Sequence, residues 1–161
     1  MALMSKLTVD YLVVGAGGMG MAFVDELLTH NQQVTVALVD RYEGPGGHWL
    51  CAYPYVSLHQ PAAFYGVNSE PLGTGGMTLA SGKEVVSYFQ RVVNKHIGGG
   101  RLKYFPQCQY HFGDSSTHRF TSNLSGDVYE IEVARKFVDA TYMKVEVPAM
   151  REPPFPVAVD C

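Results

Sequence analysis

The sequence predicts an α/β fold with a parallel β-sheet at its centre, and three observations lead to this prediction. A short β-branched run over residues 9–14 ends at a glycine-rich turn, as a buried strand does before a helix. A helical pattern of apolar residues begins at Gly18, and a second strand over 33–40 ends in Asp40. Strand, helix and strand in this order form a right-handed crossover between parallel strands.

The first helix should turn one apolar face toward the sheet. The positions that recur at helical spacing are Gly20, Phe23, Val24, Leu27 and Leu28. Asp25 and Glu26 are expected on the opposite face of the helix.

Residues 41–80 are rich in glycine, proline and aromatic residues, and a long irregular connection of this kind is usually functional. A second helix begins at Ser81, because Ser81 and Glu84 form a capping box. Its apolar stripe is expected to be Val85, Tyr88, Phe89 and Val92. The glycines at 98–100 end this helix, and residues 101–105 read as a third strand.

The next part of the chain predicts antiparallel structure. Two strands, 118–122 and 128–134, flank the turn sequence NLSGD, with Tyr129, Ile131 and Val133 facing one way and Glu130 and Glu132 the other. Residues 136–141 read as a separate short buried strand. The proline-rich character after Tyr142 predicts a domain over residues 1–142 and a tail or linker over 143–161.

Composition excludes several classes of protein. The chain has 161 residues, a formal net charge of −3 and 12 Lys plus Arg, which gives no electrostatic reason to expect nucleic acid. No apolar run is long enough for a membrane span, and the N-terminus lacks a leader pattern, so a cytoplasmic protein is expected. Cys51, Cys108 and Cys161 read as reduced thiols, and the pair His111 and His118 is not read as a metal site.

The turn after the first strand fits the pattern G-x-G-x-x-G with Gly15, Gly17 and Gly20. Gly15 allows the tight turn, Gly17 lets a pyrophosphate approach the backbone, and Gly20 lets the helix pack closely on the strands. Asp40 follows at the end of the second strand, where a carboxylate can accept a hydrogen bond from a ribose hydroxyl. A purely structural glycine turn is the alternative. Because the acid would repel a 2′-phosphate, the pattern favours NAD or FAD over NADP at this turn.

Four further segments resemble the flavin-containing monooxygenases and Baeyer–Villiger monooxygenases. They are DRYEGPGGHW, YPYVSLHQPAAFYGVNS, SGKEVVSYFQRVVNKH and FVDATY, and the resemblance spans about residues 8–148. It implies a Rossmann-like FAD/NAD(P)-binding three-layer domain, in which a central parallel sheet has helices on one face and an antiparallel meander on the other.

The resemblance also implies cofactor contacts. The turn that would hold the FAD pyrophosphate comprises Gly15, Gly17, Gly18, Met19 and Gly20. Asp40, with Arg41 beside it, would bind the adenosine ribose, and Gly47, His48 and Trp49 would line the bend around the dinucleotide. The backbone of Cys108 would pair with the adenine edge, and Ala140 and Thr141 would approach the cofactor through their backbone.

Some positions depart from the family pattern. Tyr55 and His59 stand where the family often has a glycine and an aspartate, and Tyr142 replaces the glycine of Ala-Thr-Gly. His59 would titrate or donate near the flavin, or it would be a loop histidine bonded to backbone. The polar residues for which packing is favoured over lining a pocket are Gln60, Tyr65 and Asn68.

A second glycine-rich turn for a nicotinamide cofactor is missing, since the clusters at 73–77 and 98–100 do not sit between a strand and a helix. The chain is therefore expected to be the FAD-binding portion of a flavin-dependent oxidoreductase that uses NAD(P)H, monooxygenase-like and completed by a second domain or partner chain. No catalytic residue stands out. There are two alternatives: a non-catalytic FAD/NAD-binding module that acts with a partner chain, and a small NAD-binding dehydrogenase domain. A homo-oligomer is also compatible with the sequence.

Overall fold

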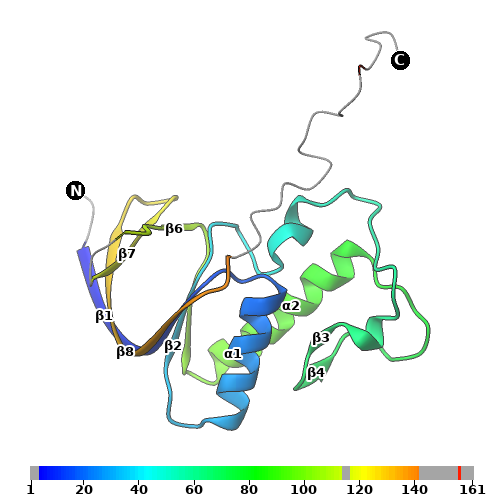
Figure 1. The fold of residues 1–161 in the computed structure, drawn as a ribbon, viewed down its shortest axis with the longest axis horizontal. Helices are drawn as coiled ribbons and strands as arrows, with labels where there is room; N and C mark the ends of the chain where they lie inside the picture. Colours follow the sequence, from blue (N-terminus) through cyan, green and yellow to red (C-terminus); the bar gives the residue numbers. More distant parts are fainter. Residues whose placement is uncertain (1–3, 114–116, 142–155, 157–161) are drawn as a thin grey trace.

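The computed structural model describes residues 4–113, 117–141 and Pro156 (Figure 1). Tyr142 and nearly all of the predicted tail, 143–161, lie outside the described residues. The domain boundary at residue 142 therefore stays a prediction.

One six-stranded sheet forms the centre of the domain. In spatial order its strands are β5 (Leu102–Phe105), β2 (Val36–Val39), β1 (Met4–Val14), β8 (Val128–Asp139), β7 (His118–Ser122) and β6 (Cys108–Tyr110). The first four run parallel to one another, and β7 and β6 continue the sheet in antiparallel order. The predicted parallel sheet, strand–helix–strand unit and hairpin are confirmed.

Both long helices, α1 (Gly18–His30) and α2 (Gly82–Gly98), lie on one face of the sheet (Figure 1). The connection before α2 contains only short elements, which are η1 (Gly47–Cys51), η2 (Ala62–Phe64), β3 (Gly66–Val67) and β4 (Glu70–Pro71). Residues along β1 alternate between two cores: Val13 packs with the helices, and Leu12 and Val14 pack with Phe120 of the antiparallel meander on the opposite face. This arrangement is the predicted three-layer α/β domain.

Two predicted details were wrong. The helix α1 buries Met21 and Asp25, while Phe23 lies on an exposed side of the helix, so the buried face is rotated relative to the apolar pattern. The reason is that Asp25 has hydrogen-bond partners in distant segments. Residues 136–139 of the expected separate strand are part of β8, because β1 pairs with this strand on both sides of a register shift at residues 134–135.

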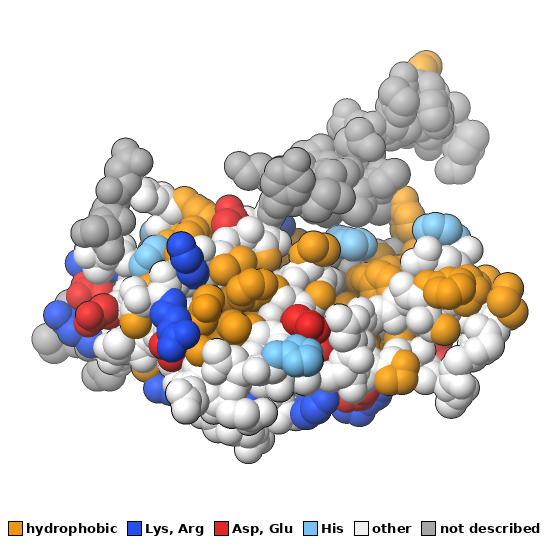
Figure 2. Space-filling view, turned by 60° about the horizontal axis from the view of Figure 1, so that its bottom comes forward, with side chains coloured by type: hydrophobic (Ala, Val, Ile, Leu, Met, Phe, Trp, Pro, Cys, Tyr) orange, Lys and Arg blue, Asp and Glu red, His pale blue; other side chains and the backbone are white. Residues whose placement is uncertain are grey.

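Hydrophobic side chains also reach the surface, and Figure 2 shows several patches of them on one face. Among the large hydrophobic residues of the 41–80 connection, Tyr55, Phe64 and Met77 are the most exposed. This connection therefore presents several large apolar side chains to solvent.

The capping box at the start of α2 is present as predicted. The Ser81 Oγ accepts from the Glu84 N–H at 3.3 Å, and the Ser81 N–H donates to the Glu84 carboxylate at 2.7 Å. Replacing Ser81 with alanine should lower the free energy of unfolding by about 1 kcal/mol, because the first turn loses a side-chain acceptor. Ser87→Ala, at an exposed position within the same helix, is the control for urea denaturation. Equal midpoints for the two variants would contradict the assigned cap.

Candidate functional site

The glycine turn between β1 and α1 leaves no room for a side chain at Gly15 or Gly20. Gly15 has a φ of +107°, and a Cβ there would lie 3.0 Å from the backbone carbonyl of Ala140. A Cβ on Gly20 would lie 1.9 Å from the Gly15 carbonyl oxygen. The helix α1 then begins at Gly18 without a side-chain cap, with Gly17 as its N-cap. Its first N–H groups are thus left to backbone, water or ligand partners.

The loop after β2 packs directly on this turn. The Gly46 N–H donates to the Ala16 carbonyl at 2.8 Å, and a Cβ on Gly47 would lie 2.9 Å from the Gly17 Cα. Gly47 has a φ of +57°, a conformation that glycine adopts without strain. We name the surface formed by Gly15, Gly17 and Gly47 the glycine cradle. It presents backbone alone at the N-terminus of a helix, which is the arrangement that receives a phosphate.

Asp40 lies beside the glycine cradle, as its spacing predicted, but its carboxylate already has backbone partners. One oxygen accepts from the Ala16 N–H at 2.5 Å and the other from the Tyr42 N–H at 2.7 Å. Burial raises the pKa of Asp40, against the opposing effect of these two hydrogen bonds. The carboxylate therefore ties the end of β2 to the glycine turn. Arg41 is exposed and stacks on the ring of Tyr42, with its guanidinium carbon 4.8 Å from the ring centroid.

Tyr65, for which the sequence favoured a packing role over a pocket role, lies against the glycine turn. The indole N–H of Trp49 donates to the Tyr65 hydroxyl at 2.7 Å, and this hydroxyl lies 3.4 Å from the position of a Cβ on Gly18. Because the oxygen accepts from the indole, the phenol retains its own hydrogen for donation. Burial raises the pKa of Tyr65, so the hydroxyl stays protonated. The sequence shows a tyrosine at this position, but Tyr65 is far from Gly18 in the chain, so no local pattern predicts the contact between them.

The end of β8 closes the third side of the turn. The Ala140 N–H donates to the Val14 carbonyl at 2.8 Å, which holds the Ala140 backbone against Gly15. Thr141 is fixed by Asp139, whose carboxylate accepts from the Thr141 N–H at 2.8 Å and from its hydroxyl at 2.5 Å. Asp139 was not among the predicted residues. The Ala140 backbone and the Thr141 side-chain methyl therefore lie against Gly15, and the backbone contacts of both residues with a cofactor stay predictions.

Other predicted residues lie at the edges of this arrangement. Met19 is 77% exposed, and His48 is exposed with its ring stacked on Trp49 at 5.4 Å between centroids. Tyr55 and His59 are exposed in the long connection. Their contacts with a cofactor stay predictions.

Two further predicted residues have hydrogen-bond partners in the protein, and a third is partly buried. Cys108 is buried in β6, and its N–H donates to the Asp40 carbonyl at 2.9 Å. Asn68 turns away from the glycine cradle and donates to Glu26 at 3.0 Å. Gln60 is half-buried in the long connection. Asn68 is thus bonded on the outer side of α1, which agrees with the structural role favoured for it.

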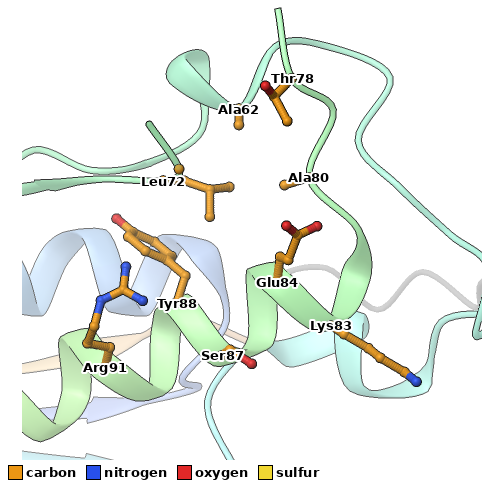
Figure 3. Close-up of a pocket in the computed structure, with 10 residues that line it drawn as sticks. Ala62, Leu72, Thr78, Ala80, Lys83, Glu84, Ser87, Tyr88 and Arg91 are labelled. Atoms are coloured by element: carbon orange, nitrogen blue, oxygen red, sulfur yellow. The ribbon is translucent and has the colours of Figure 1, made fainter. Parts of the chain in front are cut away.

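A hollow of about 330 Å³ lies beside α2, between this helix and the long connection (Figure 3). Its lining includes Leu72, Ala80, Glu84, Tyr88 and Arg91. It contains none of the predicted cofactor residues, so it is separate from the glycine cradle. Among the described residues, no three His, Cys, Asp or Glu side chains are grouped as metal ligands, and no helix has the length and hydropathy to cross a membrane.

A scan against protein-family profiles finds no match. The chain is 46% identical over 165 residues to an uncharacterized protein of Mycobacterium tuberculosis, covering 94% of this chain and 30% of that protein. It is 30% identical over 89 residues to a probable FAD-binding monooxygenase, AlmA, of Acinetobacter baylyi, covering 55% of this chain and 18% of that protein. The chain thus spans less than a third of the length of these relatives.

Solved structures share the fold. A flavin-containing monooxygenase from Stenotrophomonas maltophilia has a TM-score of 0.62 at 22% identity, covering 83% of this chain and 38% of that one. Cyclohexanone monooxygenase from Rhodococcus sp. Phi1, bound to NADP+, has a TM-score of 0.62 at 24% identity, covering 89% and 28%. Bacillithiol disulfide reductase from Staphylococcus aureus has a TM-score of 0.60 at 16% identity, covering 83% and 38%.

Proposed function

The chain has the Rossmann-like fold of flavin-containing and Baeyer–Villiger monooxygenases, and we propose that it binds FAD at the glycine cradle. It would thereby form the FAD-binding portion of a flavin-dependent oxidoreductase that uses NAD(P)H. The observation that carries this proposal is the contact between Gly17 and Gly47, which leaves backbone alone at the uncapped N-terminus of α1. A pyrophosphate fits such a surface because it needs N–H donors and close approach.

The residues around the cradle have distinct roles in this proposal. The first turn of α1 binds the pyrophosphate through its N–H groups and the positive end of the helix dipole. The Tyr65 hydroxyl, oriented by Trp49, adds a donor beside Gly18. Asp40 holds the turn and offers its remaining lone pairs to the ribose. Ala140 and Thr141 exclude water from the third side. When bound, the flavin supplies the electron-transfer chemistry.

FAD is favoured over the nicotinamide cofactors by two features. The Asp40 carboxylate disfavours a 2′-phosphate, which argues against NADP at this turn. After β5 the chain forms the antiparallel β6–β7 extension in place of further strand–helix repeats, which differs from a dehydrogenase domain built of such repeats. The match to a protein described as a probable FAD-binding monooxygenase supports the same choice.

The electron donor would bind elsewhere. The glycines at 73–76 lie in the loop after β4, and those at 98–100 end α2, so neither cluster joins a strand to a helix start. A second domain or a partner chain would therefore supply the NAD(P)H site, and the substrate of the complete enzyme would be set there as well.

Gly17→Ala tests the FAD site without disturbing the fold. A Cβ at this position would meet the Gly47 Cα at 3.6 Å, an ordinary contact, yet it would stand where the pyrophosphate approaches. The expected result is an unchanged melting temperature and an FAD affinity weakened at least about tenfold. The purified chain is titrated with FAD, followed by flavin fluorescence, with Gly98→Ala in α2 as the matched control.

Two outcomes would contradict the proposal. Wild-type protein that retains no flavin absorbance after incubation with FAD and desalting would rule out the FAD site. If NAD then raises the melting temperature, the dehydrogenase alternative takes its place. Equal FAD affinities for Gly17→Ala and wild type would place the cofactor away from the glycine cradle.

A further inference from the structure

A small hairpin outside the glycine cradle is bonded to both long helices. It consists of β3 and β4 with Asn68 and Ser69 at its turn. On the α2 side, the Tyr88 hydroxyl accepts from the Val67 N–H at 2.7 Å and donates to the Glu70 carbonyl at 2.5 Å. Figure 3 shows Tyr88 rising from α2 beneath Leu72. The hairpin is therefore attached through its backbone to a buried side chain of α2.

Gly66 permits this attachment. Its φ is +126°, and a Cβ there would lie 2.6 Å from the Tyr88 hydroxyl oxygen. A glycine is thus required where the hairpin begins, directly after Tyr65.

A polar cluster, with Asp25 and His96 buried and Ser69 at the surface, attaches the hairpin turn to α1. Asp25 accepts from the Ser69 hydroxyl at 2.5 Å and from the Ser69 N–H at 3.1 Å, and its carboxylate also lies 2.8 Å from the His96 Nε2 of α2. Asp25 is 1% exposed and His96 8%, so this pair is desolvated. Lys95 donates to the Ser69 hydroxyl from the surface at 2.9 Å. We name Asp25, Ser69 and His96 the hairpin cluster.

The hairpin cluster depends on the ionised form of Asp25. Removing a carboxylate from water is costly, and a buried carboxylate is tolerated when hydrogen-bond partners replace the lost water. Burial acts to raise the pKa of Asp25, but the hydrogen bonds from Ser69 and His96 outweigh it and the pKa is lowered. The carboxylate is therefore ionised and holds both the turn and the second helix.

The hairpin cluster is connected to the glycine cradle through a short stretch of chain. Tyr65 immediately precedes β3, packs its ring edge on Phe89 at 6.1 Å between centroids, and accepts from Trp49 beside Gly18. With Gly66 fixed against Tyr88, the reach of the Tyr65 hydroxyl depends on where the hairpin lies.

We propose that the hairpin cluster is a positioning element for the cradle: it holds β3 and β4 on both helices so that the Tyr65 hydroxyl stays against Trp49 and the first turn of α1. Asp25, Ser69 and His96 are positioning residues that act through Tyr65 and do not touch a ligand. The effect on cofactor affinity rests on the proposed FAD site, whereas the effect on the Trp49–Tyr65 contact does not.

Trp49 is the single tryptophan of the chain, so its fluorescence reports this contact directly. Ser69→Ala removes the hydroxyl from the hairpin cluster, and Tyr65→Phe removes the hydroxyl that accepts from the indole. Asn68→Ala is the matched control, because Asn68 lies at the same turn and bonds only the exposed Glu26 in the described part of the chain. Emission spectra and FAD titrations are recorded for the four proteins.

The expected result is that Ser69→Ala shifts the Trp49 emission in the direction of Tyr65→Phe and weakens FAD binding at least about threefold. Asn68→Ala leaves both unchanged. In the double variant of Ser69→Ala and Tyr65→Phe, the loss of affinity should not exceed that of Tyr65→Phe alone, which a general loss of stability would not produce.

Folded Ser69→Ala protein with wild-type Trp49 emission would overturn the inference whether or not FAD binds. If Ser69→Ala is unstable, His96→Gln is measured in its place, because it keeps an N–H donor but changes the length and shape of the side chain that bonds Asp25. Wild-type Trp49 emission in that variant would likewise count against the positioning role. A wild-type chain that takes up no FAD would refute the proposed function alone.

Discussion

Gly20→Ala is expected to have the largest effect of any single-methyl addition in the glycine turn. The new Cβ would lie 1.9 Å from the Gly15 carbonyl oxygen and 3.3 Å from the Ala140 Cβ. The first of these atoms is backbone and cannot move without breaking the turn or separating α1 from the sheet. We expect the free energy of unfolding to fall by at least about 3 kcal/mol, at the upper end of overpacking effects. FAD affinity should be lost with the fold of the turn.

Urea denaturation of Gly20→Ala, followed by far-UV circular dichroism, measures this loss. Gly98→Ala is the control, since a Cβ at the end of α2 meets no atom within 4 Å. Wild-type stability of Gly20→Ala would mean that α1 does not lie as close to β1 as described. Comparison with Gly17→Ala separates helix packing from cofactor binding, because of these two glycines Gly20 is needed for packing and Gly17 is not.

Asp25→Ala should have the second largest effect. The substitution leaves the buried His96 ring and the Ser69 N–H without their acceptor. Each buried polar group left without its partner typically costs about 1–3 kcal/mol, so the loss of this carboxylate should cost about 3–5 kcal/mol in all. Glu26→Ala, at the neighbouring exposed position, should cost no more than about 1 kcal/mol, since its contacts with Asn68 and His30 lie at the surface. Thermal and urea denaturation of the two variants provide the comparison, and equal losses would contradict the burial of Asp25.

The pH dependence follows from the lowered pKa of Asp25. In the unfolded chain the carboxyl titrates at its ordinary value of 3.8, and in the folded protein it titrates lower. Its contribution to stability is therefore complete above the ordinary pKa and disappears as the pH falls through the lowered value. The difference in stability between wild type and Asp25→Ala should narrow in that acid range.

Local patterns predicted the elements that depend on neighbouring residues. The capping box of Ser81 and Glu84 and the apolar stripe of α2 are set within one or two helical turns, and both are present. The crowding around Gly15 and Gly20 also followed from the spacing of the glycines. These features could be predicted because their partners are close in the sequence.

The burial of Asp25 could not be predicted in this way. Its partners Ser69 and His96 lie 44 and 71 residues away, so a helical pattern alone places a carboxylate on the outer face. The contact of Tyr65 with the first turn of α1 was concealed for the same reason. Asp40 accepts hydrogen bonds from the N–H groups of Ala16 and Tyr42. These bonds depend on the conformation of the loop after β2, which the spacing of residues in the sequence does not predict.

The strands of the meander show a similar limit. The three residues of β6 are too short for a periodic signal, and Gln107 before them has a φ of +50°, which is uncommon for a residue with a side chain. β8 was divided in the prediction at residue 135, where Arg135 and Lys136 interrupt the apolar pattern. Arg135 in that stretch bonds Asp10 of β1 at 2.9 Å, a contact across the chain that supports the strand where the pattern fails.

The pairing of β1 with β8 has a consequence for the order in which the protein is made. Of the two neighbours of β1, β2 is synthesised soon after it and can pair with it early. The other edge of β1 pairs from Met4 with Val128 to Val14 with Asp139, so that edge has no partner until nearly the whole domain has been synthesised. Closing so long a loop is slow, and an unpaired strand edge invites association with other chains in the meantime. The docking of β8 is thus the step that pairs the second edge of β1.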